Sequence, residues 1–190
     1  MVDSETRWRM VRKLRQKGPE PEVPITIRKA TTQDLPQIKD VYNYFIRNTV
    51  VTFDEKPLDL GYWQEKLEVL NKFELPFLVL CKGEMNVIGF AFVAPWRQRS
   101  GYLKVVENSI YLSAAATGKK LGTKLLSELI RESKNLGVRE IIAVIADRGA
   151  DASIALHKKL GFQEQGHLAK IGVRFGKPIG SYLLSLNLGK

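Results

Sequence analysis

The sequence predicts an α/β fold in which helices flank both faces of a central mixed β-sheet. The order of the patterns favours it, because strand-like and helix-like segments follow one another as β α α β β β α β α β β. The segment VREIIAVIA is almost uniformly apolar, which is typical of a strand covered on both faces. Apolar residues make up 44 % of the 190-residue chain, which is enough for a substantial core.

The first elements are a strand, two helices and a hairpin. Residues 25–30 have a strand pattern, and residues 59–73 have a helix pattern. Residues 31–48 predict a helix, because apolar side chains recur at helical spacing at Leu35, Ile38, Val41, Tyr42 and Phe45. Residues 77–95 predict a β-hairpin, because the turn-forming residues GEMN interrupt two apolar runs.

The later elements alternate between strands and helices before two strands close the chain. They are a strand at 102–112, a helix at 122–137, a strand at 138–146, a helix at 151–161 and strands at 161–172 and 181–188. Glycines end both helices, as is common where a left-handed residue follows the last turn. We expect the strands at 102–112 and 139–146 to lie at the centre of the sheet.

The chain divides into a basic N-terminal extension with a Pro-rich linker at 1–24 and one domain at 25–190. Trp8, Val11 and Leu14 of the extension have helical spacing among arginines and lysines, and prolines follow them. Such a segment is either an extension that is solvated or packed on the domain, or a short amphipathic helix that touches a partner or a membrane surface.

The composition limits the classes of partner that the protein could bind. The net charge of +10 suits nucleic acid, a membrane surface or a small anionic ligand. No nucleic-acid-binding motif and no metal-ligand cluster is found, and no apolar run approaches the roughly 20 residues that span a bilayer. Cys81 is the single cysteine, is expected to be buried, and excludes an intrachain disulfide. These features favour a cytoplasmic protein.

The stretch SAAATGKKLGTKLL, at 113–126, joins a predicted strand to a predicted helix. Its glycines allow close approach of the backbone, and the first N–H groups of the helix lack intrahelical partners. Such a junction binds anions well, although a basic helix start can equally be a solvated turn. The glycine spacing matches neither the nucleotide triphosphate loop nor the dinucleotide fingerprint.

Several stretches in order resemble the GNAT superfamily of acetyl-CoA-dependent N-acetyltransferases, and within it the phosphinothricin and methionine sulfoximine acetyltransferase group. They are IRKATTQDLPQI, NTVVTFDEKP, GFAFVAPWRQRSGY, VENSIYL, GKKLGTKLL and ASIALHKKLGF. The resemblance covers residues 25–188 and implies the GNAT acyl-CoA N-acyltransferase fold. It also implies acetyl-CoA as co-substrate, no metal, and a homodimer.

The resemblance implies how the cofactor would bind. Backbone amides of the loop would wrap the pyrophosphate, and the strand that precedes the loop would pair with the pantetheine arm. The implied cofactor-binding residues are Ile110, Tyr111, Leu112, Gly118, Lys119, Lys120, Leu121, Gly122, Thr123 and Ser153.

The resemblance also implies catalytic roles. Glu107 would act as general base, because an ammonium must lose a proton before it can attack. The Leu112 N–H would stabilise the oxyanion of the tetrahedral intermediate, and His157 would protonate the departing thiolate. The implied acceptor-binding residues are Phe53, Arg97, Arg99 and Tyr102, of which the arginines suit a carboxylate or phosphinate.

Some positions depart from the family pattern. Thr117 replaces a Gln or Arg, Lys120 replaces a glycine, and Ala150 replaces an Asn at the start of the last helix. Pro178 and Gly180 alter a C-terminal segment that in the group helps form the acceptor pocket or dimer. These changes concern cofactor affinity and the identity of the acceptor rather than the fold.

The sequence thus favours an N-acetyltransferase that acts on the α-amino group of a small amino-acid-like acceptor by direct attack. Phosphinothricin, methionine sulfoximine or sulfone, or a related amino acid would be the acceptor. Alternatives are an acetyltransferase for a polyamine, an aminoglycoside or a protein N-terminus, and a GNAT-fold binding module with weak CoA affinity. A nucleic-acid or membrane-associated protein that uses the basic extension is a further alternative.

Overall fold

The computed structural model describes residues 5, 23–97, 99–116 and 118–189. Its strands form one seven-stranded sheet in the order β1-β2-β3-β4-β5-β7-β6. The strands are β1 Ile25–Lys29, β2 Phe77–Lys82, β3 Asn86–Pro95, β4 Val105–Leu112, β5 Glu140–Ala146, β6 Gln163–Arg174 and β7 Lys177–Asn187. The helices are α2 Leu35–Asn48, α3 Leu60–Lys72, α4 Leu121–Asn135 and α5 Asp151–Lys159, with short 3₁₀ turns at Thr32–Asp34, Ser100–Tyr102 and Ala114–Ala116.

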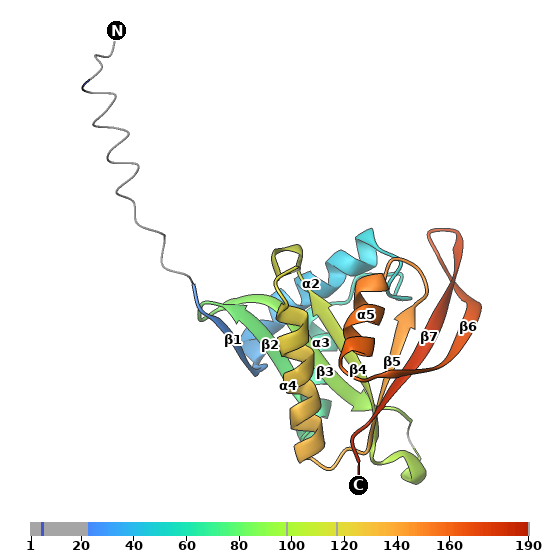
Figure 1. The fold of residues 1–190 in the computed structure, drawn as a ribbon. Helices are drawn as coiled ribbons and strands as arrows, with labels where there is room; N and C mark the ends of the chain where they lie inside the picture. Colours follow the sequence, from blue (N-terminus) through green and yellow to red (C-terminus); the bar gives the residue numbers. More distant parts are fainter. Residues whose placement is uncertain (1–4, 6–22, 98, 117, 190) are drawn as a thin grey trace.

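This order confirms the predicted succession of elements. Figure 1 shows α4 and α5 on one face of the sheet and α2 and α3 on the other, as the prediction of helices on both faces requires. The predicted helix in the extension and the departure at Thr117 lie outside the described residues.

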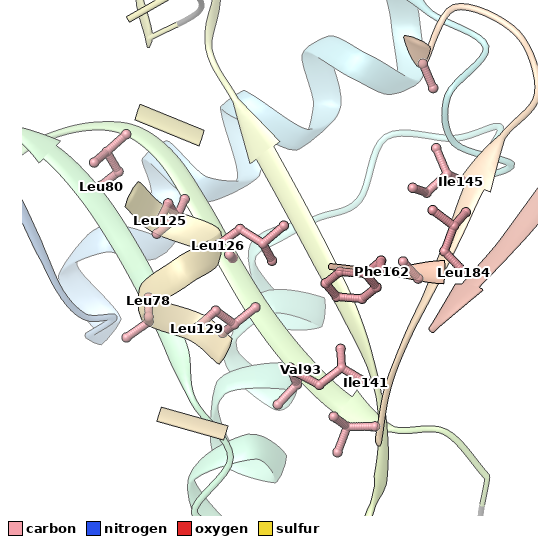
Figure 2. Packing of buried hydrophobic residues seen from close by; sticks show 14 of the residues in the cluster. Leu78, Leu80, Val93, Leu125, Leu126, Leu129, Ile141, Ile145, Phe162 and Leu184 are labelled. Carbon is pink, nitrogen blue, oxygen red and sulfur yellow. The ribbon is translucent and has the colours of Figure 1, made fainter. Parts of the chain in front are cut away.

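Two hydrophobic clusters hold these layers together, one on each face of the sheet. On the first face, α4 buries Leu125, Leu126 and Leu129 completely against the strands, as Figure 2 shows. Truncation of such a leucine to alanine costs about 2–5 kcal/mol of folding free energy. On the second face, fully buried Trp63 of α3 packs edge-on against Phe90 of β3. Cys81 also lies buried there, as predicted.

A partly buried ion pair ties the first strand to the start of the first helix. Arg28 of β1 makes two hydrogen bonds of 2.7 Å to the carboxylate of Asp34, which is completely buried. The backbone N–H and the hydroxyl of Thr31 donate to the same carboxylate at 2.8 and 2.9 Å. Burial raises the pKa of Asp34, but the hydrogen bonds from Arg28 and Thr31 outweigh burial and lower it below its ordinary value.

The sheet is antiparallel except between its two central strands. β4 and β5 run parallel, and they pair only from Val105 to Glu107 against Glu140 to Ile142. Beyond that point β4 keeps its antiparallel pairing with β3, whereas β5 keeps its pairing with β7. The two strands therefore diverge, and the gap opens in the middle of the sheet (Figure 1).

Three sequence predictions need correction. The strand predicted at 102–112 begins only at Val105, because residues 100–102 form a 3₁₀ turn. The last strand begins at Lys177 rather than at 181, because the hairpin turn lies between β6 and β7 at Phe175 and Gly176. β5 is covered fully on one face only, since Val144 on the other face is 39 % exposed.

Candidate active site

The divergence of β4 and β5 produces a cleft with a volume of about 290 Å³. Residues 107–112 of β4 form one wall, and residues 143–146 of β5 form the other. Ser153 and His157 of α5 also line it. Within the described residues, the edge of β4 beyond Glu107 has no strand partner on this side, so its backbone groups can pair with an extended ligand as a neighbouring strand would.

A second, smaller pocket of about 170 Å³ lies between β4 and the helices of the α2–α3 face. Alternate residues of β4 line it, because side chains along a strand point to opposite faces in turn. The lining side chains from other elements are Tyr42, Tyr62, Trp63, Lys66, Phe92 and Ala94. Glu107, Ser109 and Tyr111 line both cavities, so the two spaces meet along this strand.

Glu107 lies where the two cavities meet, at the last residue of β4 that pairs with β5. Its side chain is partly buried rather than directed into bulk solvent. Burial raises the pKa of the Glu107 carboxyl above its ordinary value, and the charge of nearby Lys66 lowers it in part. A raised pKa makes a carboxylate a stronger proton acceptor, which suits the general base that the sequence resemblance implies.

Two tyrosines and a carboxylate form a network behind this junction. The ring of Tyr111 packs edge-on against that of Tyr42, with centroids 4.8 Å apart. The hydroxyl of Tyr42 lies 3.1 Å from the hydroxyl of Thr52 and donates a short hydrogen bond to Asp54. Burial raises the pKa of Tyr111 to about 12, although the hydrogen bond with Tyr42 lowers it in part. Tyr111 therefore keeps its proton at neutral pH.

His157 is 1 % exposed, and both of its ring nitrogens have partners. Nδ1 lies 2.8 Å from the carbonyl oxygen of Ser153, which can only accept, so Nδ1 carries a hydrogen. The side-chain N–H of Asn108 lies 3.0 Å from Nε2 and donates to it. Burial, partly offset by the Ser153 carbonyl, lowers the pKa of His157. This arrangement favours a neutral ring that orients Asn108, and the acid role of His157 stays a prediction.

The loop after β4 leads into α4 through two left-handed residues. Gly118 has φ +74°, and Lys120, the residue directly before α4, has φ +58°. Among the described residues, no side chain caps the first turn of α4. The exposed Lys119, Lys120 and Lys124 surround this end of the helix, where free N–H groups and the helix dipole favour an anion.

Gly122 has a packing role that its place in the loop did not reveal. A Cβ at Gly122 would come within 2.9 Å of a methyl group of Leu112 and 3.3 Å of one of Leu156. Thr123, the next residue, is partly exposed, whereas Leu121 is buried in the core. The glycine therefore lets the first turn of α4 lie against the end of β4 and against α5.

The four residues predicted to bind the acceptor line neither cavity. Arg97 and Arg99 are exposed in the connection between β3 and β4, where the guanidinium of Arg97 lies 5.3 Å from the Trp96 ring centroid. Tyr102 ends the 3₁₀ turn of the same connection, and Phe53 lies 41 % exposed against Gly172 of β6. Their acceptor-binding role therefore stays a prediction. Their positions within a single chain do not support it.

Sequence reasoning missed other residues around Glu107. Lys66 and Tyr62 of α3 and Tyr42 of α2 line the smaller pocket, and Asn108 contacts His157. Tyr42 was expected only as part of an apolar helix face. No sequence signal distinguishes such residues, because their approach to β4 depends on how two helices pack on the sheet.

The departure at Gly180 has a structural reason. The Gly180 N–H donates to Asp147 Oδ1 at 2.9 Å, and the other oxygen of Asp147 lies 2.9 Å from Nε2 of His167. A Cβ at Gly180 would come within 2.5 Å of the Leu168 carbonyl oxygen. The glycine thus lets β7 approach both β6 and the end of β5.

Comparisons with known proteins agree with this architecture. The sequence model described as "Acetyltransferase (GNAT) family" matches residues 38–162. The chain is 34 % identical over 163 residues to an L-methionine sulfoximine/L-methionine sulfone acetyltransferase of Pseudomonas paraeruginosa, which covers 86 % of this chain and 94 % of that protein. It is 32 % identical over 166 residues to a phosphinothricin N-acetyltransferase of Alcaligenes faecalis, with 86 % and 84 % covered.

Comparison with a solved structure indicates the same family and fold. A GNAT superfamily phosphinothricin acetyltransferase from Sinorhizobium meliloti, in complex with acetyl-CoA, superposes with a TM-score of 0.82. The two sequences are 36 % identical, and the superposition covers 87 % of this chain and 89 % of that one. The expected GNAT fold is confirmed, and the chain belongs to the GNAT acetyltransferase family.

Proposed function

We propose that the protein transfers the acetyl group of acetyl-CoA to the α-amino group of a small amino-acid-like acceptor. Phosphinothricin, methionine sulfoximine, methionine sulfone or a related amino acid is the expected acceptor. The observation that carries the proposal is the position of Glu107, a partly buried carboxylate at the junction of a long cleft and a small pocket. The cleft suits an extended cofactor, and the pocket suits a small amine.

Two features of the chain fit acetyl-CoA, which would supply an acetyl group activated as a thioester. The unpaired edge of β4, at Ile110, Tyr111 and Leu112, can hydrogen-bond the amide groups of a pantetheine arm. The uncapped start of α4, with Lys119 and Lys120 beside it, can hold a pyrophosphate. Ser153 also lines the cleft.

Glu107 would accept a proton from the acceptor ammonium, directly or through a water molecule. The free amine then attacks the thioester carbonyl carbon, its nitrogen loses a second proton, and the carbon–sulfur bond breaks as CoA leaves as a thiolate with its electron pair. The Leu112 N–H is the expected donor to the oxyanion. The proton for the thiolate was predicted to come from His157, but the ring hydrogen of His157 faces the Ser153 carbonyl and Nε2 accepts from Asn108, so these contacts do not support that role. No metal is required for this chemistry.

The assembly and location are also proposals. We infer a homodimer, because β6 is an edge strand on which Leu168, Ile171 and Val173 are exposed apolar residues. A cytoplasmic location is supported by the chain's single cysteine, a buried free thiol. Among the described residues, no helix is long and apolar enough to cross a membrane.

A direct assay tests the proposal. Binding of acetyl-CoA is measured by calorimetry, and release of the CoA thiol is then followed with methionine sulfone, phosphinothricin, proteinogenic amino acids, an aminoglycoside and spermidine. Turnover of amino acids is expected. No cofactor binding at millimolar concentration would end the enzyme interpretation in favour of a binding module. Turnover of spermidine and of no amino acid would overturn the acceptor class.

A further inference from the structure

Lys66 is the basic residue that lines the pocket beside Glu107. It lies on α3 between two residues whose side chains are buried in the core, Trp63 and Leu67, so the helix holds it at the edge of the packed face. Its ammonium lies 5.3 Å from the Tyr62 ring centroid and 5.5 Å from that of Phe92. Cation–π attraction at these distances keeps the charge over the pocket rather than in bulk solvent.

The ammonium of Lys66 interacts with Glu107 only through space. The pKa of Glu107 responds to the charge of Lys66, but within the described part of the chain no carboxylate lies within 4.0 Å of that ammonium. The pocket therefore presents a negative group at one position and a positive group at another, with space between them. An α-amino acid has the complementary arrangement, because its ammonium and its carboxylate are attached to the same carbon.

We propose that Lys66 binds the carboxylate of the acceptor while Glu107 faces its ammonium, so that this pair selects zwitterionic acceptors. The inference rests on the proposed acetylation of an amino acid and names the group that recognises its acid end. It assigns this role to a residue that lines the same pocket as the proposed base, whereas the acceptor-binding role of Arg97 and Arg99, which line neither cavity, stays a separate prediction. The walls of Tyr42, Tyr62 and Phe92 are left for the acceptor side chain.

The same arrangement disfavours polyamines. A polyamine would place a second ammonium near that of Lys66, where like charges repel each other. A neutral amine of similar shape would lack the attraction to Lys66 and would leave that cation without a ligand partner. The pocket should therefore distinguish between acceptors by the charge next to the amine more than by the length of the acceptor's side chain.

The test compares two acceptors of similar size and shape, L-methionine sulfone, which carries the carboxylate, and its primary amide, which does not. KM and kcat are measured for wild type, Lys66→Met, Lys66→Gln, Lys66→Arg and the control Lys72→Met. Lys72 is an exposed lysine at the end of the same helix, outside the lining of the pocket. A charge-assisted hydrogen bond accounts for about 10- to 100-fold in affinity.

We expect Lys66→Met and Lys66→Gln to raise KM for the sulfone about 10-fold or more, with little change for the amide. Lys66→Arg should retain most of the preference, and Lys72→Met should behave as wild type. Equal effects on both acceptors, or no effect on either, would overturn the assignment of Lys66. A wild-type enzyme that acetylates no amino acid would instead refute the proposed function, which is a separate outcome.

Discussion

Lys120 has a left-handed backbone conformation, φ +58°, at a position where the related loop pattern has glycine. A residue with a Cβ is less stable than glycine in this region by about 1 kcal/mol. The side chain is exposed at the uncapped end of α4, where the proposed pyrophosphate site lies. Lys120→Gly removes both the strain and the positive charge, so stability and cofactor affinity should change in opposite directions.

The two effects can be measured separately. Urea unfolding of the cofactor-free protein should show a free energy of unfolding higher by about 0.5–1 kcal/mol. Relief of the strain contributes about 1 kcal/mol, and the entropy that glycine gains in the unfolded chain offsets part of it. Calorimetry should show acetyl-CoA binding weakened about 5-fold, since an exposed ionic contact contributes up to about 1 kcal/mol. The ratio of the dissociation constants of Lys120→Gly and wild type should shrink as the salt concentration is raised, because salt screens exposed charges.

Lys119→Ala is the matched control, because Lys119 is also exposed and has no left-handed backbone. It should weaken acetyl-CoA binding without stabilising the fold. Tighter binding of acetyl-CoA by Lys120→Gly at every salt concentration would show that the lysine obstructs the site. An unchanged free energy of unfolding for Lys120→Gly would refute the strain argument.

Three further predictions concern the base, the ion pair and the glycine of β7. Glu107→Gln should lower kcat/KM about 10²–10⁴-fold at neutral pH. Wild-type kcat/KM should fall as pH drops through the raised pKa of Glu107, and a mutant with wild-type turnover at pH 7 would exclude this base. Asp34→Asn should cost about 2 kcal/mol in urea unfolding at pH 7, since Asp34 is buried and Arg28 is partly exposed. The folded pKa of Asp34 is depressed, so its contribution is complete above the unfolded value of about 3.9 and is lost as pH falls through the folded value. If the free energy of unfolding of the wild type exceeded that of Asp34→Asn by the same amount at pH 2 as at pH 7, this pH dependence would be contradicted. Gly180→Ala should cost about 1–3 kcal/mol by overpacking against the Leu168 carbonyl, whereas Gly166→Ala has open space and should be nearly neutral. Equal thermal melting curves for these two glycine variants would exclude the steric argument.

Periodicity was sufficient to predict the succession of strands and helices, because each element buries one face and its apolar residues recur accordingly. Leu125, Leu126 and Leu129 are a direct example, since all three pack on the sheet as their spacing indicates. The element ends were less predictable. Residues 100–102 form a turn rather than a strand, and Lys177 and Pro178 belong to the edge pair β6–β7.

The candidate site could be predicted only where it follows the chain locally. VENSIYL placed Glu107 and residues expected to bind the cofactor on one strand, and the loop placed Gly118 and Lys120 before a helix. Lys66 could not be found in this way, because it lies 41 positions before Glu107 and reaches the pocket only through the packing of α3 on the sheet. Arg97 and Arg99 were indicated by a motif, but they line neither cavity in the single chain, and their role stays a prediction.

The alternation of β4 explains how one strand can serve two cavities. Glu107, Ser109 and Tyr111 line the pocket under α2 and α3, whereas Asn108 contacts His157 of α5 on the opposite face. Glu107 is also the last residue paired with β5, so it lies where the cleft begins. A carboxylate two positions later would also line both cavities but would lie farther along the strand from the pairing with β5. The position of Glu107, where the cleft opens beside the pocket, therefore supports the proposal that it is the base.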